Sequence, residues 1–344
     1  MTSVNRYIGA PIERVEDLRF LRGRGEYVAD LAREEMLHAA ILRSPVAHGR
    51  IRAVDAGQAL AIGGVRAVIT AAEIGIVPKI PLRLQSSPAT EPFRQPVMGA
   101  AKVPFFNRRT VAAMMGLPES AVDLIENDVG GGFGARGEFY PEDFLIPFAA
   151  RHVGRPVMWI EDRREHLIAM NHARQMDCEV EIACKRDGTI LGLRGDIFVD
   201  LGAYIRTNGL TAPRNVAQFF SGPYRIPNIG LRSSALVTNK TPTGTYRAPG
   251  RYEGSFFCER LIELAAKDLG IDGVVMRRCN LVCDAEMPYP LARIDPGDLY
   301  TQTECDSGDY AHALDRCLAE FDWEQKRKLQ GRLIDGRYHG VAVA

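Results

Sequence analysis

The sequence lacks long hydrophobic runs. Its apolar stretches all fall well short of the roughly 20 residues that a membrane-spanning helix needs. The opening sequence MTSVNRY also lacks the apolar segment of a secretory signal. We therefore expect a cytoplasmic protein without a membrane span.

An excess of charge of either sign is also missing. Lys plus Arg number 43, and Asp plus Glu number 43, so the formal net charge is zero. Proteins that bind nucleic acid or acidic membranes through their general surface need a basic excess. The charge balance argues against both classes of partner.

Closely spaced cysteines are absent as well. No C-x-x-C pair occurs, and no spacing fits a zinc site or an iron–sulfur cluster. The seven cysteines stand at positions 178, 184, 258, 279, 283, 305 and 317. We expect them to be reduced, buried thiols.

The sequence does contain enough apolar material for a sizeable core. Of its 344 residues, 46% are hydrophobic, and the length suits about two or three domains. Apolar alternation and helical periodicity both occur, which indicates an α+β protein. The expected strands cover 36–43, 50–55, 65–70, 177–184, 190–200 and 231–238, and the expected helices cover 107–116, 141–152, 256–269 and 307–329. Between residues 77 and 107 six prolines and no sustained period predict a junction without a core of its own.

A glycine-rich turn is the most informative stretch. Val122, Leu124 and Ile125 predict a short buried strand before it, and Pro141 predicts the first turn of a helix after it. Five of the eight residues from Gly130 to Gly137 are glycine. Such a turn leaves backbone N–H groups pointing outward, which suits an anion or a polar cofactor.

The turn alone leaves three interpretations open. Residues Gly132–Gly137 satisfy G-x-G-x-x-G, and Glu161 with Asp162 follows a second strand-like run, so an NAD(P)-binding fold is one. A loop for another cofactor is the second, and a tight connection without a ligand is the third. The hairpin expected at 177–200 disfavours the dinucleotide fold, because it interrupts the β-α-β alternation.

A second constrained loop carries two cations. Arg247 and Arg251 flank Pro249, which fixes its own φ and restricts Ala248. An arginine held in this way can clamp a phosphate or a developing oxyanion. The alternative is a surface arginine paired with a nearby glutamate.

Three blocks in this order resemble the large, molybdenum-binding subunit of the xanthine dehydrogenase / aldehyde oxidase / aerobic carbon monoxide dehydrogenase family. They are Arg14–Asp30 with Leu42–His48, then Asp128–Gly134 with Tyr140–Asp143 and Gly154–Val157, and finally Gly222–Asn228 with Thr238–Asn239 and Tyr246–Arg251. The resemblance implies an α+β fold. A truncated a/b hammerhead domain would occupy residues 1–103, followed by part of the first molybdopterin-binding domain in residues 104–344.

The same resemblance implies the site and its chemistry. Gly131, Gly132, Phe133 and Gly134 would lie beside the molybdenum cofactor without ligating the metal. Arg247 would border the metal as the catalytic residue and contact the molybdopterin, expected in its cytosine dinucleotide form. Arg214 would orient the substrate, if one residue of gap is allowed. The family hydroxylates an aldehyde, an N-heterocycle or a similar small molecule with oxygen from water. Electrons pass to a [2Fe–2S] small subunit and an FAD-binding medium subunit.

The chain departs from the family pattern in several places. A piece the size of a small domain looks deleted between Lys102 and Asn107, and the second molybdenum domain, with its catalytic glutamate, has no counterpart here. Ala248 stands where carbon monoxide dehydrogenase has a copper-binding cysteine, and Gly137 stands where purine-oxidising members have a glutamate. We therefore expect a molybdenum hydroxylase large subunit that is inactive as this chain alone. The alternatives are an NAD(P) oxidoreductase and a non-catalytic fragment.

Overall fold

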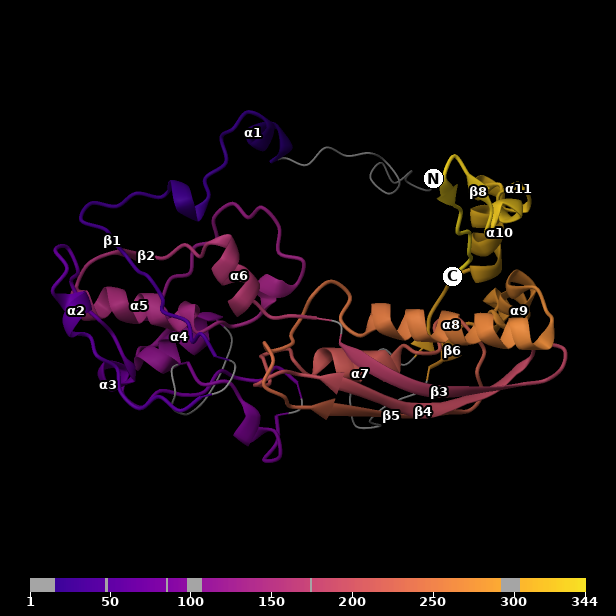
Figure 1. The fold of residues 1–344 in the computed structure, drawn as a ribbon, viewed down its shortest axis with the longest axis horizontal. Coiled ribbons are helices and arrows are strands. Elements are labelled where there is room, and N and C mark those ends of the chain that lie inside the picture. Colours follow the sequence, from indigo (N-terminus) through magenta and orange to yellow (C-terminus); the bar gives the residue numbers. More distant parts are fainter. Residues whose placement is uncertain (1–15, 47–48, 85, 98–106, 174, 292–303) are drawn as a thin grey trace, which may run out of the picture.

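The chain folds into two lobes, and one of them is built on a three-stranded sheet. The computed structural model describes residues 16–46, 49–84, 86–97, 107–173, 175–291 and 304–344. The described residues between 16 and 173 form an N-terminal lobe of short helices and loops, and residues 175–291 form a sheet lobe beside it (Figure 1). The two predicted cofactor loops, 130–137 and 246–251, belong to different lobes. They can form one site only if the two lobes pack against each other there.

The sheet has the order β3-β4-β5, with β3 (Met176–Cys184), β4 (Ile190–Asp200) and β5 (Ile229–Leu236). Strands β3 and β4 form the predicted antiparallel hairpin, whose turn uses Gly188 at φ +89°. Strand β5 pairs with β4 in parallel, which requires a crossover, and helix α7 (Thr211–Gln218) lies in that connection. The predicted strand pattern of this lobe is therefore confirmed.

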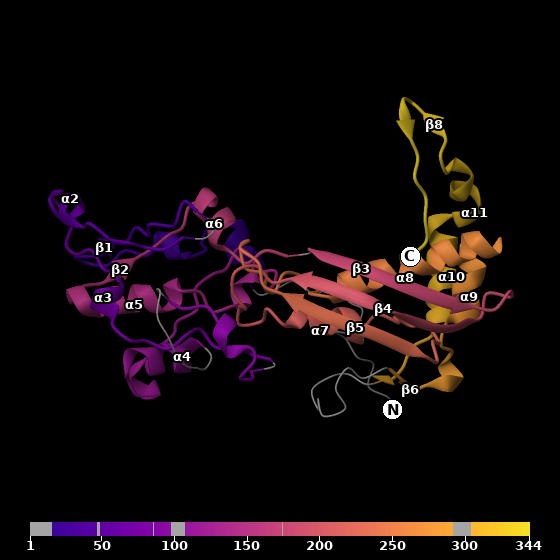
Figure 2. The ribbon, with the colours of Figure 1, turned by 60° about the horizontal axis from the view of Figure 1, so that its bottom comes forward.

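Helices α7, α8 (Arg251–Leu269) and α9 (Gly273–Asn280) pack beside the sheet (Figure 2). Helix α8 buries Cys258, Ile262 and Ala266 at a spacing of four residues, which places them on one face. They join Ile197 and other strand residues in the main hydrophobic core. The predicted helix at 256–269 is confirmed, although it begins earlier, at Arg251.

The N-terminal lobe has a smaller core of its own. Helices α3 (Ala71–Ile74), α4 (Asn107–Met115) and α5 (Glu142–Val153) surround it. Its buried members are Ile74, Val77, Ile80, Val97, Val111, Met114, Phe139 and Phe144. The prediction of a core-free junction at 77–107 is wrong for its described part. Val77, Ile80 and Val97 are separated by prolines and show no helical or strand periodicity, yet all three pack into this core.

The strands predicted near the N-terminus are mostly wrong. Residues 50–55 and 65–70 form no strand, and 36–43 contribute only β1 (Leu37–His38), which pairs in parallel with β2 (Val157–Met158). The buried strand predicted before the glycine turn is also wrong, since Leu124 is 56% exposed and Ile125 is 81% exposed. Short apolar runs do not become strands without a neighbouring strand to pair with.

This arrangement contradicts the dinucleotide-binding alternative. A doubly wound fold needs a parallel sheet and a strand leading into its glycine turn. The main sheet of the described residues is mixed, and residues 121–130 form no strand. The motif at Gly132–Gly137 therefore does not belong to an NAD(P)-binding fold.

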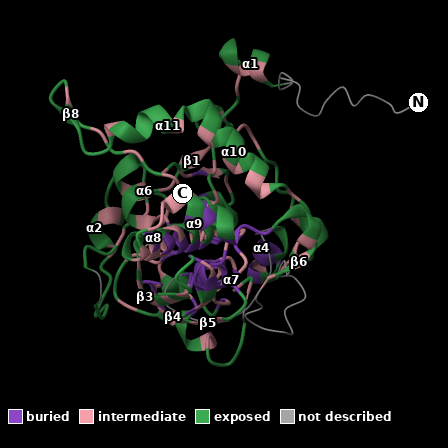
Figure 3. Ribbon diagram, turned by 90° about the vertical axis from the view of Figure 1, so that its right-hand side faces the viewer, coloured by how far each residue is buried: buried purple, intermediate pink, exposed green. Residues whose placement is uncertain are grey.

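The remaining elements lie mainly at the periphery, where α10 and α11 are largely exposed (Figure 3). They are α1 (Asp17–Leu21), α2 (Gly57–Leu60), α6 (Arg163–Ala169), α10 (Tyr310–Phe321), α11 (Trp323–Lys326), β6 (Tyr289–Pro290), β7 (Glu304–Cys305), β8 (Leu333–Ile334) and β9 (Arg337–Tyr338). The helix predicted over 307–329 is interrupted at Asp322, whose φ is +58°. Within the described ranges no helix has the length and apolarity of a bilayer-spanning segment.

The seven cysteines are free thiols in different environments. Cys258 is buried, and burial raises the pKa of its thiol to about 12. Cys279, Cys283 and Cys317 are exposed, so the expectation of buried thiols is wrong for these three.

The domain boundary expected at residues 103/104 and the deletion expected at Lys102–Asn107 both fall in or beside residues 98–106, outside the described part. Both stay predictions. The small core draws on residues from either side of that point, from Ile74 to Phe144.

Candidate functional site

The glycine-rich turn adopts a conformation that few sequences allow. Gly131, Phe133 and Gly134 all have positive φ, at +129°, +47° and +90°. A non-glycine residue in this region costs roughly 1–2 kcal/mol, so Phe133 is held there by its surroundings. The turn closes with Ala135 N–H donating to Gly132 O at 2.9 Å. Phe133 is left 63% exposed on the surface.

The second loop has the same kind of backbone strain. Ala248 has a φ of +56°, directly after Arg247. Its carbonyl accepts from the N–H groups of Arg251 and Tyr252, so the strained residue leads into the first turn of α8. Gly250 has a φ of +75°, and a Cβ there would lie 2.3 Å from Ala212 O on α7. Helix α7 therefore lies directly beneath the loop.

These two loops are in direct contact. Arg247 N–H donates to Phe133 O at 2.7 Å. A Cβ on Gly134 would lie 2.6 Å from Thr245 Cγ2, so the close approach requires glycine at this position. This hydrogen bond joins residues more than 100 positions apart in sequence. Its acceptor, Phe133, has a positive φ, and so does Ala248, the residue after its donor.

The glycine turn presents unused backbone donors. Within the part of the chain that the structure describes, the N–H groups of Gly132, Phe133 and Gly134 donate to no protein acceptor. Consecutive N–H groups in a turn with left-handed residues form a concave site that favours anions. The exposed Arg247 on the neighbouring loop adds a cation. This donor set fits an anionic group that bears oxygen atoms.

Asp128 anchors the entrance to the turn. Its carboxylate accepts from Arg19 at 2.5 and 2.6 Å and from Glu26 N–H at 2.6 Å. The hydrogen bond from Arg19 and that from Glu26 hold the pKa of Asp128 below its ordinary value. The first and second blocks of the resemblance are thereby tied together.

Two buried polar residues near the loops were not predicted from the sequence. Glu138, one residue past Gly137, is only 2% exposed, and Asn171 is only 1% exposed. Both contact Thr245, directly before the Tyr246–Arg247 pair. A single glutamate between Gly137 and Phe139 is a weak signal in sequence, because only the folded chain shows which backbone groups it meets.

Arg214 lies on α7 and is half-buried. The next residue, Asn215, donates through Nδ2 to Pro249 O at 3.0 Å, so α7 contacts the Arg247 loop at this level. Arg214 is thus on the helix that supports the candidate site. Its substrate-orienting role stays a prediction.

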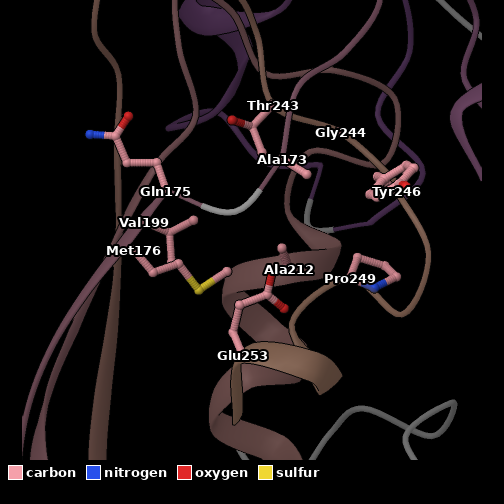
Figure 4. Close-up of a pocket in the computed structure, with 10 residues that line it drawn as sticks. All are labelled: Ala173, Gln175, Met176, Val199, Ala212, Thr243, Gly244, Tyr246, Pro249 and Glu253. Carbon is pink, nitrogen blue, oxygen red and sulfur yellow. The ribbon is translucent and has the colours of Figure 1, made fainter. Parts of the chain in front are cut away.

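A small cavity lies at the foot of the Arg247 loop (Figure 4). It is lined by Ala173, Gln175, Met176, Val199, Ala212, Thr243, Gly244, Tyr246, Pro249 and Glu253. Its volume of about 10 Å³ corresponds to a single water molecule. A ligand of cofactor size does not fit in this cavity, so such a ligand would contact the two loops at their open face.

Among the described residues, no three His, Cys, Asp or Glu side chains gather at metal-ligand geometry. The candidate site instead consists of backbone donors and an arginine. These groups could hold the organic part and the terminal oxygens of a cofactor without ligating a metal through side chains.

Two family models match the chain. The molybdopterin cofactor-binding domain matches residues 87–281, and the a/b hammerhead domain of aldehyde oxidase and xanthine dehydrogenase matches residues 22–115. The two matches overlap at residues 87–115. Both loops of the candidate site fall within the molybdopterin-binding match.

Curated proteins and solved structures give the same result. The gamma subunit of the 6-hydroxypseudooxynicotine dehydrogenase complex from Paenarthrobacter nicotinovorans is 38% identical over 69% of this chain and 30% of its own length. The carbon monoxide dehydrogenase large chain of Hydrogenophaga pseudoflava is 26% identical over 92% of this chain and 54% of its own. The structure of quinoline 2-oxidoreductase from Pseudomonas putida 86 matches with 26% identity and a TM-score of 0.80, over 93% of this chain and 55% of that one.

The chain spans about half the length of these relatives, or less. The alignment with the carbon monoxide dehydrogenase chain covers 445 positions, more than the 344 residues present here. That relative therefore has residues inside the aligned span for which this chain has no counterpart. The finding agrees with the expected internal deletion and leaves its position open.

Proposed function

Because the chain belongs to the molybdopterin-binding family of xanthine dehydrogenase and aldehyde oxidase, we propose that it forms part of the large subunit of a molybdenum hydroxylase. One observation carries the proposal: the hydrogen bond from Arg247 N–H to Phe133 O joins the two loops that the family resemblance assigns to the cofactor. They form one surface of backbone donors with a cation beside it.

We assign the contacts of the cofactor to the residues on this surface. Gly131 and Gly134 give the turn its left-handed conformation, and the N–H groups of Gly132, Phe133 and Gly134 donate to the oxygen atoms of the cofactor. Arg247 supplies the positive charge next to them. When bound, the cofactor would supply the chemistry that hydroxylates a carbon centre of the substrate with oxygen from water. The protein orients the cofactor and its substrate.

For the substrate, we propose an N-heterocycle. Nicotine and quinoline are N-heterocycles, and they or their derivatives appear in the names of two of the relatives. Ala248 has no thiol, so a copper site of the carbon monoxide dehydrogenase type has no ligand at that position. Gly137 cannot make the carboxylate contact expected of purine-oxidising members. Arg214 is the proposed substrate-orienting cation.

The proposal extends to partners and to the form of the cofactor. Relatives named as a large chain or a gamma subunit belong to assemblies of several chains. We propose an FAD-binding medium subunit and a [2Fe–2S] small subunit as the route for electrons, and the cytosine dinucleotide form of molybdopterin.

The described residues form an open wall of the proposed cofactor site. Phe133 and Arg247 are exposed, and the adjacent cavity has room for only one water molecule. A cofactor bound to an open wall stays solvated, and catalysis needs the reacting groups held within hydrogen-bond reach. We propose that this chain alone binds the cofactor weakly and does not turn over substrate.

The test is to purify the chain from a host that makes the cofactor. Molybdenum per chain is measured by mass spectrometry, and turnover by dye reduction with quinoline, pyridines and aldehydes. We expect less than one molybdenum per chain and no turnover. Stoichiometric molybdenum with turnover would contradict the incomplete site, and molybdenum at the background of an unrelated protein would favour a non-catalytic fragment.

A further inference from the structure

Thr245 is held on both sides by buried side chains. Its N–H donates to Glu138 Oε1 at 2.7 Å, and its carbonyl accepts from Asn171 Nδ2 at 2.8 Å. We call Glu138, Asn171 and the Thr245 backbone the Thr245 clamp. Thr245 is two residues before Arg247, so the clamp fixes the backbone that carries the proposed cofactor contact.

The remaining polar atoms of the clamp also have partners. Glu138 Oε2 accepts from Asn208 N–H at 2.8 Å. The Tyr140 hydroxyl lies within hydrogen-bonding range of both Asn171 Oδ1 and Ala135 O at the end of the glycine turn, and its single proton is shared between these two acceptors. Such buried, satisfied networks define a single geometry, because any change leaves a polar group without a partner.

Gly244 shows how closely the clamp fits. A Cβ at this position would lie 2.7 Å from Glu138 Oε1 and 2.8 Å from Asn171 Nδ2. Its φ lies outside the left-handed region, so the backbone itself would accept alanine. Glycine is needed at this position because the clamp leaves no space for a side chain.

Residues 133–138, in the glycine turn and directly after it, therefore hold the Arg247 loop at two points. Phe133 O accepts from Arg247 N–H, and Glu138, five residues later, accepts from Thr245 N–H. Two attachments on one short segment fix both the distance and the tilt of the loop, whereas one hydrogen bond would leave a hinge.

We propose that Glu138 and Asn171 are positioning residues, which set the Arg247 loop against the glycine turn before any cofactor binds. The identity of the group that this surface receives rests on the proposed function. The clamp itself is a property of the chain and can be measured without the cofactor.

The first experiment is hydrogen exchange on the chain from a host that lacks the cofactor. Glu138→Gln offers one carboxamide oxygen to two N–H donors, and Asn171→Asp faces the Thr245 carbonyl with an acceptor. Loss of one such hydrogen bond should speed exchange in peptides covering 243–250 about tenfold, while peptides covering 176–200 stay unchanged. Gly244→Ala should have the same effect by displacing both side chains.

Glu142→Gln is the matched control. Glu142 is a buried carboxylate that pairs with Arg43 at 2.5 Å and has no bond to Thr245. We expect it to leave exchange at 243–250 unchanged. Unchanged exchange there in the Glu138 and Asn171 variants would overturn the proposal. An equal increase in peptides covering 176–200 would also overturn it, because the residues would then support the fold in general.

The second experiment measures molybdenum per chain for the same variants from a cofactor-making host. Glu138→Gln and Asn171→Asp should retain several-fold less molybdenum than Glu142→Gln at the same melting temperature. Equal retention would overturn the positioning role. A wild-type chain without molybdenum would instead count against the proposed function, and the exchange result would still decide the clamp.

Discussion

At the scale of single residues, the candidate site depends on backbone geometry more than on side-chain chemistry. Phe133 and Ala248 are non-glycine residues with positive φ, and the bond between Phe133 O and Arg247 N–H lies between them. Strain of this kind persists only where surrounding contacts enforce it, and it is concentrated at functional sites. The glycines of the turn were visible in the sequence, but the strain at these two residues was not.

The two arginines of the second loop should behave differently. Arg251 lies over the ring of Phe219, with Cζ 4.5 Å from the ring centre, whereas Arg247 stands at the contact with the glycine turn. We expect Arg247→Ala to lower molybdenum per chain about tenfold, the value of one charged hydrogen bond. Arg251→Ala should instead lower the free energy of unfolding by about 0.5–1 kcal/mol and leave molybdenum unchanged.

Mass spectrometry of molybdenum and thermal unfolding of both variants separate these effects. Equal losses of molybdenum in the two variants would show that Arg247 has no special place at the cofactor.

Buried polar residues mark the limit of prediction at this scale. Gly131, Gly132, Gly134 and Arg247 could be singled out because glycine-rich turns and constrained arginines are local patterns. The contacts of Glu138 could not be predicted, because the two N–H groups that donate to it lie 70 and 107 positions away along the chain. Sequence periodicity reports which residues face a core, and it says nothing of which backbone groups a buried carboxylate meets.

At the scale of elements, sequence periodicity predicted a helix or strand correctly where the flanking turn residues or a partner strand supported the same structure. The β3–β4 hairpin has alternating residues and a glycine turn, and α5 is stopped by Gly154 with φ +67°, as its sequence indicated. Residues 50–55 had the same alternation but found no partner strand. Strand formation depends on pairing across the sheet, which a local pattern cannot supply.

The loop after α7 provides a pH-dependent test at this scale. Arg225 donates to both oxygens of Glu286 at 2.7 and 2.8 Å, and this pairing lowers the pKa of Glu286 to about 2. The folded pKa lies below the unfolded value of 4.5, so the stabilisation is complete above that value and is lost as the pH falls through this window. Glu286→Gln should therefore lower the melting temperature near pH 6 by more than it does near about pH 3.

Thermal unfolding at the two pH values checks this expectation, with the exposed Glu126→Gln as the control. The pairing of Glu286 with Arg225 would be contradicted if the difference in melting temperature between wild type and Glu286→Gln stayed constant or grew as the pH fell.

At the scale of the whole molecule, two cores come together around one shared surface. The smaller core holds the glycine-turn segment through Phe139 and Phe144, and the larger core holds α7 and α8 beneath the Arg247 loop. The order of the three sequence blocks was enough to predict the family and the α+β fold. It did not predict that residues 77–97 pack into a core, because such contacts join segments that have no common pattern.

A hydrogen-exchange footprint of the cofactor on the full chain tests whether the two loops form the cofactor surface. Chain purified from a cofactor-making host is compared with chain from a host that lacks the cofactor. We predict slower exchange in peptides covering 130–137 and 245–250 when the cofactor is bound, with no change in β3, β4 and β5. No difference at either loop, or slower exchange confined to another part of the chain, would contradict the claim that these two loops form the cofactor surface.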